Sequence, residues 1–332
     1  MGRGERPGGA RSGRGRSQLV RPPRPSFAYQ PPWLSDCGGK KITVVGADGF
    51  IGSHVVALAL AAGADVRAVC LKDPWRLAEL DVEPEVEPRW SQLGGNDADA
   101  VAVLAYEPPP SYERDRWLAH ELEVNADGAC ELARSSARTV FASSADVYGP
   151  WRDEPVREDV DPQPATPYAQ AKLRAEARIA AEGREAALLR LATVFGSSEH
   201  SRRAIPAFIT AVGCGEQPVV HGDGSDVRDY VYVGDVAAAF VNACSSSVTG
   251  VFNLGSGMGR STLDVLQSVC GIFEADVEPR LEPTPRAPSR LIVDPSRARR
   301  ELQFSPRADF ERALREEADW LLPTPSPGRK PP

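Results

Sequence analysis

Between residues 40 and 195, short apolar runs alternate with longer helical segments. Runs typical of buried strands lie at 42–45, 65–71, 100–105, 139–142 and 187–194, and segments typical of helices lie at 55–62, 113–135 and 168–182. Strands that alternate with helices pair in parallel, so the pattern predicts an α/β fold with a doubly wound parallel sheet. Pro84 and Pro88 interrupt the second connection, and we expect its crossover helix to be missing or stunted.

After Gly196 the alternation loosens. Helical patterns lie at 234–244, 262–273, 296–302 and 310–322, with a short strand at 250–255 and a Gly-Asp-Gly turn before the apolar run that ends at Val233. A proline-rich loop spans 279–290. We interpret this half as a smaller α/β lobe over the sheet, where a substrate is enclosed.

The two ends of the chain differ from its middle. The first 38 residues are rich in Gly, Arg and Pro, and we interpret them as a disordered basic tail, because such a composition buries too little apolar surface to fold. The predicted organisation is a tail at 1–38, a dinucleotide-binding domain at 39–195 to which 226–250 returns, a substrate lobe at 196–225 and 251–322, and a disordered tail at 323–332.

Composition narrows the class of protein. The net charge of −7 over 332 residues argues against binding to nucleic acid or to a membrane surface. No apolar run approaches the roughly 20 residues that a transmembrane helix needs. The six cysteines contain no C-x-x-C pair, so neither a metal site nor a disulfide framework is expected, and a cytoplasmic location is the default.

Three glycines follow the first predicted strand, at 46, 49 and 52. Gly46 lets the chain turn, Gly49 lets phosphates approach the backbone, and Gly52 lets the helix pack on the strand. The turn and the helix N-terminus together suit a pyrophosphate. The spacing is G-x-x-G-x-x-G rather than the usual G-x-G-x-x-G, so a structural turn without a ligand is the alternative.

A phenol and an ammonium, Tyr168 and Lys172, lie four residues apart on one predicted helix face. A nearby cation lowers the pKa of a phenol from about 10 toward the range of a general base. Desolvation opposes this effect, and an oxidised nicotinamide ring would add a second positive charge. Ser144 ends a buried strand, from which its hydroxyl can donate to a carbonyl or alkoxide oxygen. The alternatives are a surface helix pair and a serine that caps a turn.

These motifs occur together and in a fixed order. The glycine turn, SSADVYG (143–149), YAQAK (168–172), LLRLATVFG (188–196), GDGSDVRDYVYVGDVAAA (222–239) and FNLGSG (252–257) follow one another along the chain. In this order they resemble the extended short-chain dehydrogenase/reductases, and most closely the NAD-dependent epimerase/dehydratase family, which includes UDP-glucose 4-epimerase. The resemblance covers about 40–322. It implies a Rossmann-type domain that binds NAD(P) and a C-terminal lobe that binds a nucleotide sugar, and it suggests a homodimer through the helices at 113–135 and 168–182.

The resemblance also assigns roles to individual residues. Its implied catalytic residues are Ser144, Tyr168 and Lys172. Its implied cofactor-binding residues are Gly46, Gly49, Phe50, Ile51, Gly52, Asp73, Leu104, Ala105, Asn125, Tyr168 and Lys172. Its implied substrate-binding residues are Ser144, Thr193 and Arg228, of which Arg228 would pair with the substrate diphosphate.

Several positions depart from the family pattern. The acidic residue that normally ends the second strand and holds the NAD ribose is replaced at 70–72 by Cys-Leu-Lys, and Asp73 comes late. Lys72 or Arg76 is a candidate partner for a 2′-phosphate, so NAD is expected and NADP stays open. Thr193 stands where sugar epimerases often carry Asn. Arg286 and Arg290 are candidates for the displaced C-terminal arginine, and Ala145-Asp146 replaces the Asp-Glu pair of dehydratases, which disfavours 4,6-dehydration.

The leading hypothesis is an NAD(P)-dependent epimerase of a UDP- or TDP-sugar. Tyr168 would accept the C4 hydroxyl proton while the C4 hydride passes to NAD and back to the other face. The first alternative is a 4-ketoreductase of a 4-keto-6-deoxyhexose nucleotide, which consumes external NAD(P)H. The second is a non-catalytic dinucleotide sensor, suggested by the altered adenine region and disfavoured by the Tyr168–Lys172 pair.

Overall fold

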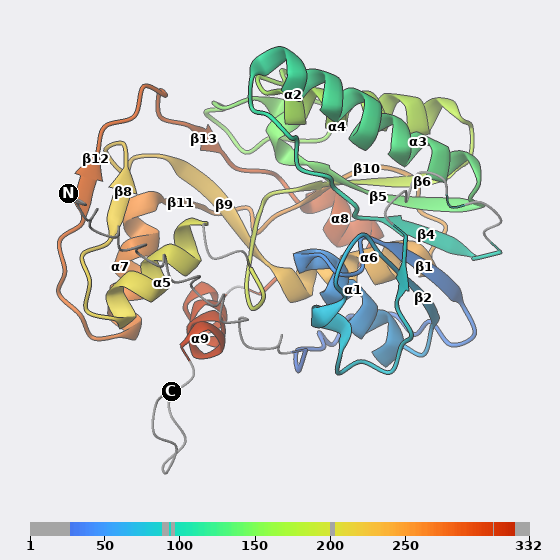
Figure 1. The fold of residues 1–332 in the computed structure, drawn as a ribbon, viewed down its shortest axis with the longest axis horizontal. Helices are drawn as coiled ribbons and strands as arrows, with labels where there is room; N and C mark the ends of the chain where they lie inside the picture. Colours follow the sequence, from blue (N-terminus) through green and yellow to red (C-terminus); the bar gives the residue numbers. More distant parts are fainter. Residues whose placement is uncertain (1–26, 88–92, 94–96, 200–202, 308, 323–332) are drawn as a thin grey trace, which may run out of the picture.

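The computed structural model of the chain describes residues 27–87, 93, 97–199, 203–307 and 309–322. The expected disorder at 1–26 and 323–332 lies outside the described residues. The described residues form a larger unit around a parallel sheet and a smaller lobe beside it (Figure 1).

The larger unit is built on a seven-stranded parallel sheet with the order β10-β6-β5-β4-β1-β2-β3. Its strands are β1 (Lys41–Val45), β2 (Asp65–Cys70), β3 (Glu85–Val86), β4 (Ala100–Val103), β5 (Arg138–Ser144), β6 (Glu185–Leu191) and β10 (Gly250–Leu254). The central strands are buried along their length because helices cover both faces. The predicted Rossmann-type α/β fold is confirmed.

Helices form one layer on each face of the sheet (Figure 1). One layer contains α1 (Phe50–Ala61) and α6 (Val233–Ser245), with α8 (Ser296–Glu301) beside β10. The other layer contains α2 (Arg114–His120), η3 (Glu121–Ala126), α3 (Asp127–Arg134) and α4 (Pro167–Ala181). The predicted helix at 113–135 is therefore present, but its middle, η3, is a π-helix.

The connection between β2 and β4 contains no α-helix within its described residues, as the prolines predicted. Its described residues hold a 3-10 turn, η1 (Trp75–Leu77), and the two-residue strand β3, which was not predicted. Strand β3 pairs with the end of β2 and extends the sheet at its edge.

In its described residues the smaller lobe contains two short sheets and three helices. Strands β7 (Thr193–Phe195), β9 (Val227–Tyr232), β11 (Gly259–Ser261) and β13 (Arg290–Leu291) form one sheet, and β8 (Val219–His221) pairs with β12 (Arg280–Glu282). The helices are α5 (Ala204–Gly213), α7 (Thr262–Ile272) and α9 (Phe310–Leu321), and a 3-10 turn, η4 (Ala145–Tyr148), follows β5. Helix α5 was not predicted; it contains Pro206 in its first turn, where proline is tolerated.

The chain crosses between the two units more than once. Strand β9 belongs to the lobe sheet, whereas α6 packs on α1 and β10 closes the edge of the large sheet. The return to the first unit, expected at 226–250, thus runs through α6 and continues to Leu254.

A segment before the first strand also packs on the core, although the composition of 1–38 predicted disorder. The Tyr29 hydroxyl donates to Asp235 Oδ1 at 2.7 Å, and the Ser35 backbone N–H donates to Asn242 Oδ1 at 2.8 Å. The Trp33 ring meets Phe304 edge-on at 5.8 Å. Aromatic residues within an otherwise polar, proline-rich stretch are what anchor it on α6.

Helix α9 and the segment after β7 bring two buried carboxyls together, Glu199 and Glu317. Burial raises the pKa of Glu199 to about 7, and burial together with the Glu199 charge raises the pKa of Glu317 well above its usual range. A carboxyl whose pKa is raised by folding binds protons more tightly in the folded state. Its contribution to stability is therefore present at low pH and is lost as the pH rises toward about 7.

Glu317→Gln should accordingly raise the free energy of unfolding by about 1 kcal/mol above neutral pH, because the amide offers a permanent donor to Glu199. The gain should shrink in acid, where the wild-type pair keeps its proton. Chemical denaturation across this pH range measures the difference, with the exposed Asp319→Asn on the same helix as the control. A Glu317→Gln chain less stable than wild type above neutral pH would contradict the prediction.

Candidate active site

The predicted glycine turn joins β1 to α1 as a tight loop. Gly46 has a φ of 89°, a conformation that favours glycine, and a Cβ there would lie 2.6 Å from the Ala105 backbone nitrogen. A Cβ on Gly52 would lie 2.0 Å from the Gly46 carbonyl oxygen. Gly49 is the N-cap of α1 and provides no side-chain hydrogen bond to the first N–H groups of the helix. This is a cradle suited to an anion.

A cavity of about 750 Å³ lies over this turn, at the carboxyl ends of the central strands. It is lined by the turn, by residues after β2 and β4, and by α4: Gly46, Asp48, Gly49, Phe50, Ile51, Gly52, Leu71, Lys72, Leu104, Ala105, Tyr106, Glu107, Pro108, Ala142, Ser143, Tyr168, Lys172, Leu191 and Arg203. Nine of the eleven predicted cofactor residues are in this lining. The other two, Asp73 and Asn125, are not.

Asn125 supports the wall of the cavity from behind. Its side chain accepts from the Glu107 backbone N–H at 2.8 Å and donates to the Glu107 carbonyl at 3.0 Å. It thereby fixes the segment after β4 that lines the cavity.

The structure shows what the residues after β2 contact, in the segment where the family's acidic residue is replaced. Asp48, inside the glycine turn, accepts hydrogen bonds from the Leu71 and Lys72 backbone N–H groups at 3.2 and 3.3 Å. Arg76 donates to the Asp48 carbonyl and to Ser198 Oγ, so its guanidinium is engaged within the protein. Of the two cations considered for a 2′-phosphate, Lys72 lines the cavity and Arg76 holds the loops together.

Of the three predicted catalytic residues, Tyr168 and Lys172 line this cavity, and Ser144 lines a second cavity that Tyr168 also lines. Helix α4 begins at Pro167, with Thr166 Oγ1 accepting from the Ala169 N–H, and this start places Tyr168 in its first turn. Lys172 Nζ donates to the Ala142 carbonyl at 2.8 Å and lies 5.6 Å from the centre of the Tyr168 ring. Ser144 ends β5, and its Oγ accepts from the Asp146 N–H at 3.1 Å.

Burial dominates the ionisation of Tyr168. It raises the pKa of the phenol far above its usual value, and the negative charges of Asp146 and Glu121 raise it further. The hydrogen bond with Ser144 and the charge of Arg203 lower it, but by less. The chain's own groups therefore do not bring the pKa of the phenol toward the range of a general base, because the opposing effect of burial is the larger one. A second positive charge beside the ring is needed.

Lys172 is also buried, and burial lowers its pKa to about 8, against the charges of Glu121 and Glu176, which raise it. Glu176 is itself paired with Arg190, whose Nη2 lies 2.6 Å from Oε2, and it accepts from the Ser143 hydroxyl. Neither carboxylate was predicted as part of the site. Both are single acidic residues in helical sequence, where nothing signals burial.

Two further cavities lie between the first cavity and the lobe, or within the lobe. One of about 260 Å³ is lined by Ser144, Asp146, Tyr168, Thr193, Arg203, Arg228 and neighbouring residues. Another of about 470 Å³, in the lobe, contains His221, Asp226, Arg228 and Arg286 in its lining. Tyr168 is shared by the first two cavities and Arg228 by the last two. Arg203, which no motif indicated, lines the first two.

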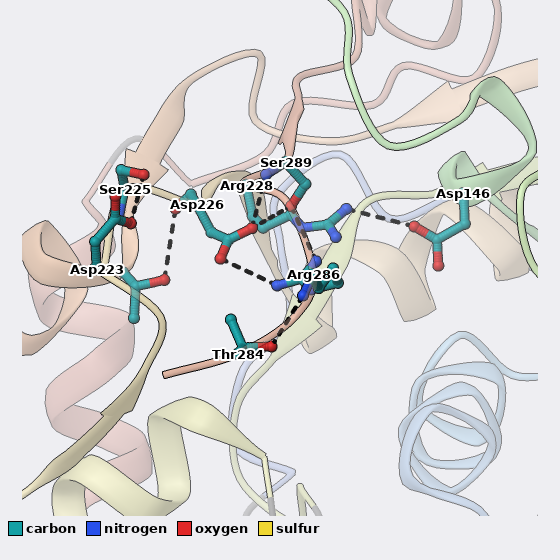
Figure 2. A network of polar contacts seen from close by, with 9 residues as sticks. Asp146, Asp223, Ser225, Asp226, Arg228, Thr284, Arg286 and Ser289 are labelled. Carbon is teal, nitrogen blue, oxygen red and sulfur yellow. Dashed lines mark hydrogen bonds and ion pairs between the residues drawn. The ribbon is translucent and has the colours of Figure 1, made fainter. Parts of the chain in front are cut away.

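Figure 2 shows the polar network at the junction with the lobe. Arg228 Nη1 lies 3.5 Å from Asp146 Oδ1, and Arg286 Nη2 lies 3.0 Å from Asp226 Oδ2. Asp226 also accepts from the Ser289 backbone and hydroxyl. Of the two arginines considered for the displaced C-terminal position, Arg286 lies in the lobe cavity, whereas Arg290 Nε donates to the Asp153 carbonyl.

The chain is similar to known proteins over most of its length. The model of the NAD dependent epimerase/dehydratase family matches residues 42–255. A UDP-glucose 4-epimerase from Corynebacterium glutamicum is 30% identical over 320 residues, which are 85% of this chain and 95% of that protein. A trifunctional UDP-glucose 4,6-dehydratase/UDP-4-keto-6-deoxy-D-glucose 3,5-epimerase/UDP-4-keto-L-rhamnose-reductase from Arabidopsis thaliana is 27% identical over 86% of this chain. The chain spans about half the length of this and two similar curated relatives.

Solved structures agree with this similarity. The structure of UDP-glucose 4-epimerase from Thermotoga maritima with UDP-glucose has a TM-score of 0.76 at 26% identity and covers 84% of this chain and 98% of its own. That of Thermus thermophilus UDP-glucose 4-epimerase in complex with NAD has a TM-score of 0.75 at 25% identity, covering 85% and 99%. Among the described residues, no helix is long and apolar enough to cross a membrane, and no group of three or more potential metal ligands occurs.

Proposed function

Because this chain belongs to the NAD-dependent epimerase/dehydratase family, we propose that it is a nucleotide-sugar epimerase that acts by transient oxidation at C4 of the sugar. One observation carries the proposal: Tyr168 lines both the first cavity, over the glycine turn, and the second, which Ser144 and Arg228 also line. A phenol shared by these two cavities faces a cofactor on one side and a sugar on the other. The enzyme class follows from the family, and the choice of reaction is our inference.

The first cavity fits NAD. Its glycine turn is tight, because a Cβ at Gly46 or Gly52 would collide with backbone atoms, and its N–H groups suit a pyrophosphate. Its inner end, beside Tyr168 and Lys172, would hold the nicotinamide. Bound NAD would supply the acceptor and donor of the C4 hydride, and its oxidised ring the second positive charge that the Tyr168 phenol needs.

Tyr168 is the base in this mechanism, and later the acid. It takes the proton of the C4 hydroxyl as the carbonyl forms and returns it when the sugar is reduced on its other face. Ser144 donates to the C4 oxygen and limits its movement. Lys172, held by the Ala142 carbonyl, keeps a positive charge close to the phenolate.

The nucleotide would lie toward the lobe. Arg228, at the junction of the second and third cavities, suits one phosphate, and Arg286 in the third cavity suits the other. Each arginine forms an ion pair with a carboxylate, Arg228 with Asp146 and Arg286 with Asp226. A diphosphate would therefore have to compete with these ion pairs.

Epimerisation fits the site better than 4,6-dehydration. Ala145 offers no acid for elimination, and the Asp146 carboxylate beside it pairs with Arg228. The second candidate function is a 4-ketoreductase that uses external NAD(P)H, and the open mouth of the first cavity at the exposed Lys72 is what favours it.

Native mass spectrometry of the purified chain is the deciding experiment. An epimerase should carry one dinucleotide and should interconvert C4 epimers of a UDP- or TDP-sugar without added cofactor. A ketoreductase should purify empty and oxidise added NAD(P)H with a 4-keto sugar nucleotide. A chain that carries a dinucleotide but turns over no sugar nucleotide would support the non-catalytic dinucleotide sensor. The same spectra report the mass of the expected homodimer.

Arg228→Met should raise KM for the sugar nucleotide by about 10- to 100-fold, because a charge-assisted contact to phosphate is lost. The change in kcat should be smaller, since in the proposed arrangement Arg228 contacts a phosphate and takes no part in the reaction at C4. Steady-state kinetics measure both constants. Arg157→Met, which removes the same charge from an exposed loop, is the control. An unchanged KM would mean that the diphosphate binds elsewhere.

A further inference from the structure

A buried carboxylate, Glu121, lies behind the Tyr168–Lys172 pair and has no part in the mechanism above. It is 1% exposed and is the first residue of the π-helical η3. This element packs against α4, the helix that carries both catalytic side chains. π-Helical turns are rare in proteins and are frequently found at functional sites.

Three neutral groups bind this carboxylate. Oε1 accepts from the Tyr106 hydroxyl at 2.7 Å and from Trp117 Nε1 at 3.0 Å, and Oε2 accepts from Asn125 Nδ2 at 3.0 Å. The donors come from the loop after β4, from α2 and from η3 itself. They fix the carboxylate without cancelling its charge, and within the described part of the chain no Arg or Lys is ion-paired with it.

The charge of Glu121 acts on Lys172 and Tyr168. It raises the pKa of both, against burial in the case of Lys172 and in addition to burial in the case of Tyr168. The other carboxylate near Lys172, Glu176, is already neutralised by two contacts from Arg190. Glu121 is therefore the uncompensated negative charge that balances the buried ammonium.

The Glu121 carboxylate also holds the Tyr106 ring in place beside the Tyr168 phenol. The Tyr106 ring meets the Tyr168 ring edge-on, with centroids 5.5 Å apart. Tyr106 lines the first cavity, and its hydroxyl is the one that donates to Glu121. Through Asn125 the cluster also holds the Glu107 backbone. One residue thus controls the charge beside Lys172 and the packing beside Tyr168.

We propose that Glu121 is a positioning residue of this active site, which keeps Lys172 protonated and holds Tyr106 against the Tyr168 ring. It lines none of the three cavities, so it acts through these neighbours. The inference rests on the proposed function, in which Tyr168 and Lys172 are the working pair. The remaining charged and titratable groups that act on the pair or on Tyr106 are Asp146, Arg203, Glu176 and Tyr112.

The pH dependence of kcat/KM tests the charge. In the proposed mechanism, kcat/KM falls at low pH because Tyr168 becomes protonated, which gives the acid limb. It falls at high pH because Lys172 loses its proton, which gives the alkaline limb. Removal of a nearby negative charge makes both groups lose their protons more easily. Glu121→Gln should therefore move both limbs to lower pH. Glu121→Met removes the same charge without setting an amide against Asn125 Nδ2, and it should do the same. Glu121→Asp keeps the charge and should leave both limbs near their wild-type positions.

A second readout does not depend on turnover. In protein stripped of cofactor, the ultraviolet absorbance of the Tyr168 phenolate is measured as the difference between each chain and its Tyr168→Phe version. This phenolate should form at lower pH in Glu121→Gln than in wild type. The inference would be overturned if folded Glu121→Gln and Glu121→Met showed wild-type pH profiles and a wild-type phenolate titration. It would also be overturned if Glu121→Asp shifted as much as they do. A fully active Tyr168→Phe chain would instead overturn the proposed function, and the phenolate titration would still test Glu121.

Discussion

Tyr168→Phe should lower kcat about 10³-fold, the usual size of a lost general base. Phe keeps the ring that fills the junction of the first two cavities and removes only the oxygen that exchanges a proton with C4. The ring contacts with Tyr106 do not need that oxygen, so the cavity wall should keep its shape. Retained dinucleotide and the KM for the sugar nucleotide should therefore change by no more than a few-fold.

Coupled spectrophotometric assay of epimerisation measures the loss, and native mass spectrometry measures retained cofactor. Tyr112→Phe is the matched control, because Tyr112 is 71% exposed, meets the Trp117 ring edge-on and lines none of the three cavities. It should be fully active. If Tyr168→Phe kept wild-type turnover on every accepted sugar nucleotide, the proton would travel by another route and the mechanism would be wrong.

The fold was predictable because its signals are local. Apolar runs such as 42–45 and 100–105 are buried on both faces of the sheet, and this produces a continuous apolar run rather than an alternating one. Pro84 and Pro88 predicted that the connection between β2 and β4 lacks a full crossover helix, and its described residues contain no α-helix. The strand β3 could not be predicted, since two exposed residues beside β2 carry no pattern of their own.

The glycines, Ser144, Tyr168 and Lys172 could be predicted because each lies in a short motif whose spacing reflects geometry. Arg203 and Glu121 could not. Their positions depend on which segment the fold places opposite them, and a single charged residue in helical sequence is normally a solvated surface residue. Burial of Glu121 becomes visible only when Tyr106, Trp117 and Asn125 converge on it from three elements.

Electrostatics required the structure as well. The four-residue spacing of Tyr168 and Lys172 predicts that the ammonium lowers the pKa of the phenol, but it does not show how deeply both are buried. In the folded chain burial outweighs every favourable charge on Tyr168. The sequence therefore predicts the Tyr168–Lys172 pair, whereas the burial that opposes ionisation of Tyr168 can be seen only in the folded chain.

The second large effect is expected at the glycine turn. Gly52→Ala should abolish retention of the dinucleotide, with an affinity loss of at least about 100-fold, and should destabilise the chain by about 1–3 kcal/mol. The new Cβ would lie 2.0 Å from the Gly46 carbonyl oxygen and 2.9 Å from its carbon, both backbone atoms that cannot rotate away. Either α1 moves off β1 or the turn opens, and both changes displace the N–H groups of the phosphate cradle.

A matched glycine separates this effect from helix propensity. Gly271 lies in α7, and a Cβ there meets no atom within 4 Å, so Gly271→Ala should bind cofactor as wild type does and should gain roughly 0.5–1 kcal/mol of stability. Dinucleotide content and thermal unfolding are measured for both variants. Because alanine normally stabilises a helix, a loss confined to Gly52→Ala assigns the cost to the contact with Gly46. A Gly52→Ala chain that purified with its full complement of dinucleotide would show that the turn does not carry the cofactor, and the position proposed for the nicotinamide beside Tyr168 would lose its anchor.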